Sequence, residues 1–237
     1  MKITDDAGNA LPWDGTTFSQ CALPVASRLG LPARVARVVV PSNVAAPPGV
    51  AGSLGLRLTE GRRRDALEHE ARAELDALIL PTGWERELLF GPAAEQIAEA
   101  ARAQAAELIV MASHGRRDGS RWLLGSVAEG VVRQAPCPVL LLRPEQEVAD
   151  FSRVLVPVDG SAPGLEVLQE VRRWLPPQSE VRALHAGDDF EFPQGVVGSV
   201  VEGQPVEVIL QQARAWPCQL LALSTHGRSG FRRLVLG

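Results

Sequence analysis

Short apolar runs alternate with amphipathic stretches along the chain, a pattern typical of strands and helices in a parallel α/β sheet. In the first half, apolar runs predict strands at 34–40, 84–90, 108–112 and 138–142. Helical spacing of apolar residues predicts helices at 17–30, 62–80, 92–106 and 127–134, and the Pro- and Gly-rich segment 42–58 is predicted to be a loop. Helices between consecutive strands imply right-handed crossovers and a sheet covered on both faces.

The second half shows the same alternation with fewer elements. We predict strands at 153–158, 180–186, 196–201 and 220–223, helices at 164–174 and 206–213, and a loop at 187–193.

Two stretches of sequence occur twice, which indicates two copies of one ancestral unit. Glu107–Arg116 resembles Gln219–Arg228 at an offset of 112 residues, whereas Pro12–Thr16 parallels Pro157–Ser161 at an offset of 145. The second copy therefore has 33 residues fewer between these two anchors. Those residues correspond to the second helix of the first copy and its lead-in.

We expect an α/β protein with two domains in tandem, 1–145 and 150–237. Each is expected to be a doubly wound five-stranded parallel sheet, the second one shortened and C-terminally incomplete, without counterparts of the helix and strand in 126–143. The first strand of the first copy should precede Pro12, although Asp5–Asn9 is a poor strand sequence.

Composition and charge exclude several classes of function. A formal net charge of −4 disfavours nonspecific nucleic-acid binding, and no apolar run approaches the ~18 residues that a membrane span requires. Lys2 is the only lysine, so a Walker-A phosphate loop is excluded, and a catalytic lysine is not expected. Cys21, Cys137 and Cys218 are scattered, which predicts neither a disulfide framework nor a zinc site and indicates a reduced, cytoplasmic protein.

Candidate chemistry lies where two neighbouring strands end. The strand at 108–112 is followed by Ser113-His114-Gly115, nine residues, and then Gly125-Ser126 at the start of a helix. Glycines let backbone N–H groups approach a phosphate, and a helix start adds N–H donors and the positive end of the dipole. Asp14, in the turn after the neighbouring strand, could bind a base or ribose, or cap the helix that follows; the same two alternatives apply to Asp159.

With these motifs in place, the chain resembles the universal stress protein family. The resemblance rests on the Asp14–Thr16 turn, the Gly91–Ile97 helix start, the spacing from Gly115 to Gly125-Ser126, the Cys137–Val139 run and the internal repeat. It implies a five-stranded doubly wound parallel sheet in each copy. It also implies that some members bind ATP or AMP, whereas others bind no nucleotide and dimerise through the fifth strand.

Carried over to this chain, the resemblance implies a site for ATP, with or without Mg²⁺. The adenine would lie near Asp14 and Val40, the ribose near Ala112, and the phosphates near the loop glycines. The implied nucleotide-binding residues of the first copy are Pro12, Asp14, Thr16, Val40, Ala112, His114, Gly115, Arg116, Gly125, Ser126 and Val127. Those of the second copy are Asp159, Ser161, Ala186, Ser224, Gly227 and Arg228. In both copies the first glycine of the family's loop is replaced, by Ala112 and by Ser224.

Three functions remain open at this point. The first is an adenine-nucleotide-binding stress-response or regulatory protein with no catalytic residues and at most weak ATP hydrolysis. The second is a nucleotide-free dimerisation or scaffold module. The third is a nucleotidyl-transfer enzyme, which is disfavoured because the His-x-Gly-His motif of such enzymes is absent. We also expect the two domains to pair within the chain, a homodimer as an alternative, no metal site, and the nucleotide in the first copy.

Overall fold

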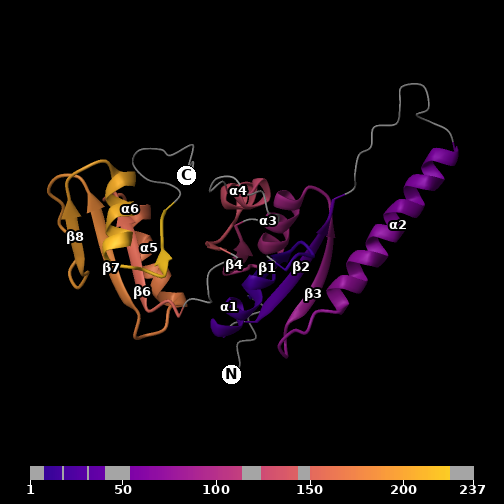
Figure 1. Cartoon of the computed structure of the whole chain (residues 1–237), viewed down its shortest axis with the longest axis horizontal. Helices are drawn as coiled ribbons and strands as arrows, with labels where there is room; N and C mark the ends of the chain where they lie inside the picture. Colours follow the sequence, from indigo (N-terminus) through magenta and orange to yellow (C-terminus); the bar gives the residue numbers. More distant parts are fainter. Residues whose placement is uncertain are drawn as a thin grey trace. The chain divides into compact units, whose positions relative to one another are not determined.

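The computed structural model describes residues 8–17, 19–30, 32–40, 54–113, 124–143 and 150–224. Contacts between residues divide the chain into two compact units, Met1–Gln146 and Glu147–Leu236, which we call unit 1 and unit 2 (Figure 1). Both are α/β, with one parallel sheet each.

Unit 1 is built on a five-stranded parallel sheet with the strand order β3-β2-β1-β4-β5, which confirms the predicted fold class. Its strands are β1 (Asn9–Trp13), β2 (Ala33–Val39), β3 (Glu85–Phe90), β4 (Leu108–Ala112) and β5 (Val139–Leu142). Its helices are the 3-10 turn η1 (Ser19–Cys21), α1 (Ala22–Arg28), α2 (Leu54–Asp76), α3 (Ala93–Ala103) and α4 (Ser126–Gln134). The strand order reverses between β1 and β4.

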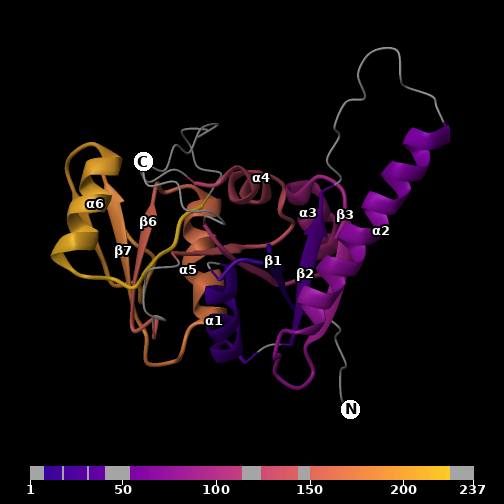
Figure 2. The same cartoon turned by 45° about the vertical axis from the view of Figure 1, so that its right-hand side comes forward.

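Helices cover both faces of this sheet. On one face Ile97 and Ala101 of α3 and Val131 of α4 pack against Ile109 and Met111 of β4. Right-handed crossovers place α1 and α2 on the opposite face, where α2 runs along β2 and β3 (Figure 2). All five residues of β4 are buried, as expected for a strand covered on both sides.

Helix α2 differs from the prediction at both ends. It begins at Leu54, inside the segment predicted to be a loop, and it ends at Asp76 rather than at residue 80. The guanidinium of Arg86 explains the early end, since it donates hydrogen bonds to the carbonyls of Leu75 (3.0 Å) and Leu78 (2.6 Å). These carbonyls lie at and beyond the last turn, where a helix leaves acceptors without intrahelical partners.

Two predicted elements near the N-terminus also need correction. Strand β1 does not precede Pro12 but includes it, and all five residues of β1 are buried although Asn9 is a poor strand former. The helix predicted from residue 17 begins as an α-helix only at Ala22, after η1. Pro24 accounts for this, because it has no N–H to bond to an earlier turn and fits only the first turn of a helix.

Unit 2 has a four-stranded parallel sheet with the order β8-β7-β6-β9. Its strands are β6 (Arg153–Val158), β7 (Glu180–Ala186), β8 (Gly198–Val201) and β9 (Leu220–Leu221), and its helices are α5 (Ala162–Trp174) and α6 (Pro205–Ala215). The described residues thus give unit 2 a shorter sheet than unit 1. Five further elements differ from their predicted bounds by two residues or more at one end. They are α3, α5, β8, α6 and β9, which were predicted at 92–106, 164–174, 196–201, 206–213 and 220–223.

No helix lies between β7 and β8, all of whose connecting residues are described. In unit 1, α2 lies between the corresponding strands β2 and β3. In its place, Phe190, Phe192 and Val196 of the connecting loop pack on the cluster that α5 forms with β6 and β7. A loop thus buries the sheet face that α2 covers in unit 1.

Candidate functional site

The hydrogen-bond ladder between β1 and β4 stops early. It extends only to Ala10, whereas β1 pairs with β2 as far as Trp13. The Gly8 carbonyl accepts a 3.2 Å hydrogen bond from the N–H of Glu107, so the backbone groups of Gly8 point toward β4. Backbone groups point to the same side at every second residue of a strand, so those of Pro12 also point toward β4. Because Pro12 has no N–H to donate, the ladder ends before the carboxyl end of β1. In open α/β sheets, ligands bind at this switch point.

Unit 2 repeats this arrangement at the level of single hydrogen bonds. The Leu155 carbonyl accepts a 2.9 Å bond from the N–H of Ala222, and the ladder between β6 and β9 ends at Leu155. Two residues further on, Pro157 faces β9 without a donor, as Pro12 does in unit 1. The two units therefore share one strand-end geometry as well as a sequence repeat.

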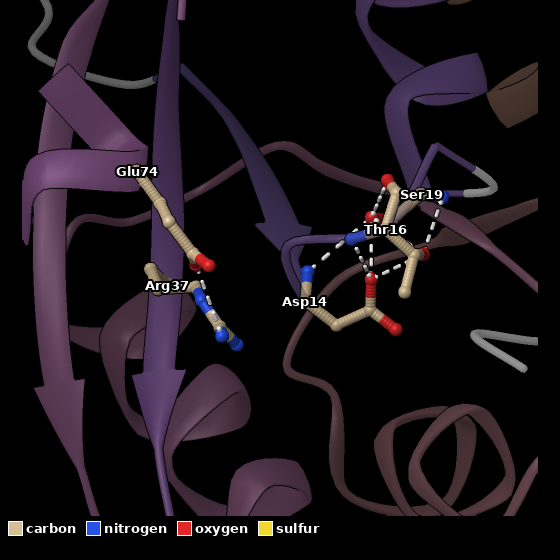
Figure 3. A network of polar contacts seen from close by, with 5 residues as sticks. All are labelled: Asp14, Thr16, Ser19, Arg37 and Glu74. Carbon is tan, nitrogen blue, oxygen red and sulfur yellow. Dashed lines mark hydrogen bonds and ion pairs between the residues drawn. The ribbon is translucent and has the colours of Figure 1, made fainter. Parts of the chain in front are cut away.

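Asp14 organises the turn after β1 (Figure 3). Its Oδ1 accepts hydrogen bonds from the Thr16 N–H (3.0 Å), the Thr16 hydroxyl (2.6 Å) and the Ser19 hydroxyl (2.6 Å). Burial raises the pKa of Asp14, but these hydrogen bonds and the charge of Arg37 outweigh it and bring the pKa below its ordinary value of 3.8. Asp14 is therefore an anion at neutral pH, and the bonds shown all go to one of its two oxygens.

A second charged pair lies beside this turn. Nη2 of Arg37 on β2 is 3.3 Å from Oε2 of Glu74 on α2, and the guanidinium carbon lies 6.0 Å from the ring centroid of Trp13. A Cβ added to Gly15 would be 3.1 Å from the Glu74 carboxylate and 3.2 Å from the Arg37 guanidinium. Gly15 also has φ +87°, so both space and backbone favour glycine here.

The start of α4 is tied to the end of β4. The Gly125 N–H donates a 3.0 Å bond to the carbonyl of Ser113, the residue after β4, and Gly125 is the N-cap of α4. The next N–H groups, from Ser126 and Val127, have no acceptor within the helix. Ser126 is exposed and Val127 is 40% exposed, whereas Ala112 at the end of β4 is 8% exposed. A helix start with free N–H groups, the kind of structure that suits an anion, therefore lies at the carboxyl edge of the sheet.

The turn after β6 excludes one of the two alternatives for Asp159, that it caps the helix that follows. Oδ1 of Asp159 accepts hydrogen bonds from the N–H (3.0 Å) and the hydroxyl (2.5 Å) of Ser161. Ser161, not Asp159, is the N-cap of α5, since its hydroxyl oxygen accepts a bond from the Gly164 N–H (3.2 Å). The interpretation of Asp159 as the helix cap was therefore wrong. Asp159 instead accepts hydrogen bonds from the capping residue Ser161, as Asp14 accepts them from Thr16 and Ser19.

Strand registers identify equivalent positions in the two units. Trp13 is opposite Arg37 in unit 1, and Val158, which is 145 residues after Trp13, is opposite His185 in unit 2. Arg37 and His185 are therefore equivalent. His185 is fixed at the strand end, with Nδ1 2.9 Å from the carbonyl oxygen of Val158.

The same registers show that two predicted base contacts, Val40 and Ala186, do not lie at equivalent positions. Ala186 follows His185, so its equivalent in unit 1 is Val38, the residue after Arg37. Val40 lies two residues beyond Val38, after the end of β2, and is 56% exposed. Val38 rather than Val40 thus occupies the position that Ala186 has in unit 2.

A model of the universal stress protein family matches residues 16–143 and 191–237. The chain belongs to this family. The sequence resemblance is therefore confirmed over both units.

Other universal stress proteins match with different coverage. One from Thermus aquaticus is 38% identical over 136 residues, which cover 56% of this chain and 96% of that protein. One from Mycolicibacterium smegmatis is 28% identical over 243 residues, covering 87% of this chain and 81% of that protein, in line with a two-domain member. The chain spans about half the length of a Mycobacterium tuberculosis relative, which it matches at 28% identity over 56% of that protein.

Solved universal stress proteins share the fold. The crystal structure of one from Archaeoglobus fulgidus has a TM-score of 0.61 at 19% sequence identity and covers 92% of this chain and 86% of its own. Two others were solved in complex with cAMP and with dAMP, at 20% and 18% identity, covering 59% and 58% of this chain and 98% of each of theirs, with TM-scores of 0.38 and 0.31.

The universal stress protein fold brings the described candidate residues to the carboxyl ends of neighbouring strands in each unit. In unit 1, Pro12 lies near the end of β1 and Asp14 and Thr16 follow that strand, and Ala112, Gly125, Ser126 and Val127 surround the end of β4. In unit 2, Asp159 and Ser161 follow β6, Ala186 ends β7, and Ser224 follows β9. His114, Gly115, Arg116, Gly227 and Arg228 lie outside the described residues.

Four residues at these strand ends escaped the sequence pattern: Ser19, Arg37, Glu74 and His185. Arg37 carries a signal in hindsight, since it is a charged residue inside a run of valines. Ser19 and Glu74 carry none, because only the folded turn and helix α2 bring them to Asp14 and Arg37.

Within the described ranges, no group of three or more His, Cys, Asp or Glu side chains is arranged to hold a metal ion. Among the helices of the described residues, none is long and apolar enough to cross a membrane.

Proposed function

We propose that unit 1 binds an adenine nucleotide at the carboxyl edge of its sheet, and that the protein acts as a nucleotide-dependent regulator in a stress response, without strong catalysis. One observation carries the proposal: the hydrogen bond from Gly125 to Ser113, which joins the start of α4 to the end of β4. It sets a helix N-terminus at the switch point of the sheet, one strand away from the Asp14 turn.

The start of α4 suits phosphate. The N–H groups of Ser126 and Val127 are free of intrahelical partners, and Ser126 is an exposed residue that carries a hydroxyl group. Hydrogen bonds to a charged group contribute about 1.5–3 kcal/mol each, and the dipole adds about 0.3–1 kcal/mol. An anion is therefore the ligand that this helix end favours.

The turn after β1 suits a group that donates hydrogen bonds. Oδ1 of Asp14 is engaged by Thr16 and Ser19, and this fixes the direction of the second oxygen, Oδ2. A fixed carboxylate oxygen accepts well from an amino group such as that of adenine. The base would then lie between Asp14, after β1, and Val38, near the end of β2. The phosphates would lie at the start of α4, beside the end of β4, which is the strand next to β1.

Strong catalysis does not fit the groups at this edge. Asp14 has a lowered pKa, so it is a poor general base and is not protonated to act as an acid at neutral pH. A binding and signalling role requires neither, and weak ATP hydrolysis would be the most that we expect. A nucleotide-free scaffold is the competing role and is one outcome of the test below.

The test measures nucleotide directly. Protein purified from cells is denatured, and the released small molecules are identified by mass spectrometry. Calorimetric titration with ATP and AMP, with and without Mg²⁺, then compares the wild type with Gly125→Asp. Because Gly125 is an N-cap with φ −60°, aspartate fits the backbone and caps helices well, so the variant should stay folded.

Thr82→Asp is the matched control. It adds the same charge at an exposed position in the turn before β3, at the other end of the sheet. We expect Gly125→Asp to weaken nucleotide binding at least tenfold and Thr82→Asp to leave it unchanged. No released nucleotide and no binding by the wild type would favour the scaffold role instead.

A further inference from the structure

An aromatic ring lies between the two strand ends of unit 2. Phe190, from the loop that replaces α2, stacks on the imidazole of His185, with ring centroids 4.4 Å apart and planes 18° from parallel. The same ring reaches the turn after β6, since a Cβ added to Gly160 would be 2.9 Å from its Cε2 atom. Phe190 thus bridges the carboxyl ends of β6 and β7.

The ring is held in this position from several directions. Phe192 packs edge-on against Phe190 at 5.0 Å, and its own ring fits against Gly198 of β8, where an added Cβ would be 2.7 Å from its Cζ atom. His185 is fixed in turn by its contact with the Val158 carbonyl. Both phenylalanines also pack on the buried cluster of α5, β6 and β7. Phe190 is therefore an integral part of unit 2.

Unit 1 places charged groups at the equivalent point. Gly15 corresponds to Gly160, and the atoms nearest to it belong to Arg37 and Glu74 rather than to a ring. The position of His185 is taken by Arg37. The two units thus share the Asp-Gly turn and differ in what lies against its glycine.

We propose that Phe190 occupies the base subsite of unit 2 and excludes adenine from it. The inference rests on the proposed function, which places the base between the Asp-Gly turn and the end of the next strand. In unit 2 these two walls are the turn at Gly160 and the end of β7, and Phe190 contacts Gly160 and His185, the residue before Ala186. The ring supplies the aromatic stacking that a bound base would otherwise provide.

The test uses the full chain and adenosine, which probes the base subsite without the phosphates. Calorimetry counts adenosine sites in the wild type, in Phe190→Ala and in the matched control Phe192→Ala, which removes an equal ring from the same loop but away from Gly160. We expect Phe190→Ala to bind one adenosine more per chain than the other two proteins. Adding Asp159→Ala to Phe190→Ala should weaken the new site at least tenfold.

A measurement on the wild type keeps the proposal falsifiable if Phe190→Ala fails to fold. The imidazole NMR signals of His185 should not move when adenosine is added to the wild type at concentrations that saturate any other site. Movement of these signals, or a folded Phe190→Ala that gains no site, would overturn the proposal. The outcome separates it from the proposed function: a gained site in Phe190→Ala supports the role of Phe190 even if unit 1 of the wild type binds no nucleotide.

Discussion

Ser19 and Asp14 face each other across the turn after β1, with the Ser19 hydroxyl 2.6 Å from Oδ1 of Asp14. Ser19 is buried, and its hydroxyl oxygen also lies 3.3 Å from the Asp14 N–H. These two contacts stabilise the turn. The Asp14 carboxylate therefore has a structural role in addition to being a candidate for ligand binding.

The Asp14 turn predicts a specific pH dependence. Because the folded pKa of Asp14 is lowered below 3.8, its stabilising effect is complete above about pH 4 and is lost as the pH falls through the folded pKa. We expect Asp14→Asn to lower the free energy of unfolding by about 1 kcal/mol at pH 7. The gap to the wild type should close as the pH falls through the folded pKa of Asp14, as measured by urea unfolding at a series of pH values. A gap that is independent of pH would contradict the role of the charge.

The N-cap of α5 predicts that loss of the Ser161 hydroxyl destabilises unit 2. Ser161→Ala removes the acceptor for the Gly164 N–H and the donor to Asp159, and should destabilise unit 2 by about 1 kcal/mol. Ser161→Thr is the matched control, since threonine stands at the equivalent position of unit 1, Thr16, and keeps the hydroxyl. Thermal unfolding should separate alanine from threonine; equal midpoints for the two variants would show that the cap is unimportant.

Asn9 predicts a stabilising substitution. It lies in the middle of the sheet, 1% exposed, and neither its amide nitrogen nor its oxygen has a hydrogen-bond partner among the described residues. Unsatisfied buried polar groups cost about 1–3 kcal/mol, and valine has a similar size and favours strands. Asn9→Val should therefore raise the urea midpoint. A lower midpoint would mean that the amide has a partner outside the described residues.

Cys137 is expected to be unreactive at neutral pH. Burial raises the pKa of its thiol from 9.0 to about 11, so at pH 8 it has about a hundredfold less thiolate than an ordinary cysteine. Burial also raises the pKa of Cys21 and Cys218. Iodoacetamide labelling followed by peptide mass spectrometry should show slow modification of Cys137 at pH 8 that accelerates as the pH approaches 11. Rapid labelling at pH 7 would contradict this environment.

Strand and helix positions followed from the apolar pattern where burial was two-sided. The run at 108–112 was predicted without error, because every residue of β4 is buried. The pattern failed for β1, where Asn9 and Pro12 are poor strand residues that the surrounding sheet nevertheless holds. It also failed at the start of α2, where glycine and proline composition suggested a loop.

The candidate site was predictable only where local sequence determines it. Asp14-Gly15-Thr16 and Gly125-Ser126 are contiguous motifs, so their turn and helix start could be recognised directly. Arg37 and Glu74 are 37 residues apart and meet only through the packing of α2 on β2. The choice between Val38 and Val40 depended on strand register, which a run of three valines cannot specify.

The loop that replaces α2 has a consequence for the folding of the two sheets. Eleven residues, 187–197, connect β7 to β8, whereas 45 residues, 40–84, connect β2 to β3. Closing the shorter connection costs about 1 kcal/mol less chain entropy, and the pairs that it brings together are closer in sequence. We therefore expect β7 and β8 to pair early in folding. We expect β2 and β3 of unit 1 to pair later, because the segment that connects them is longer.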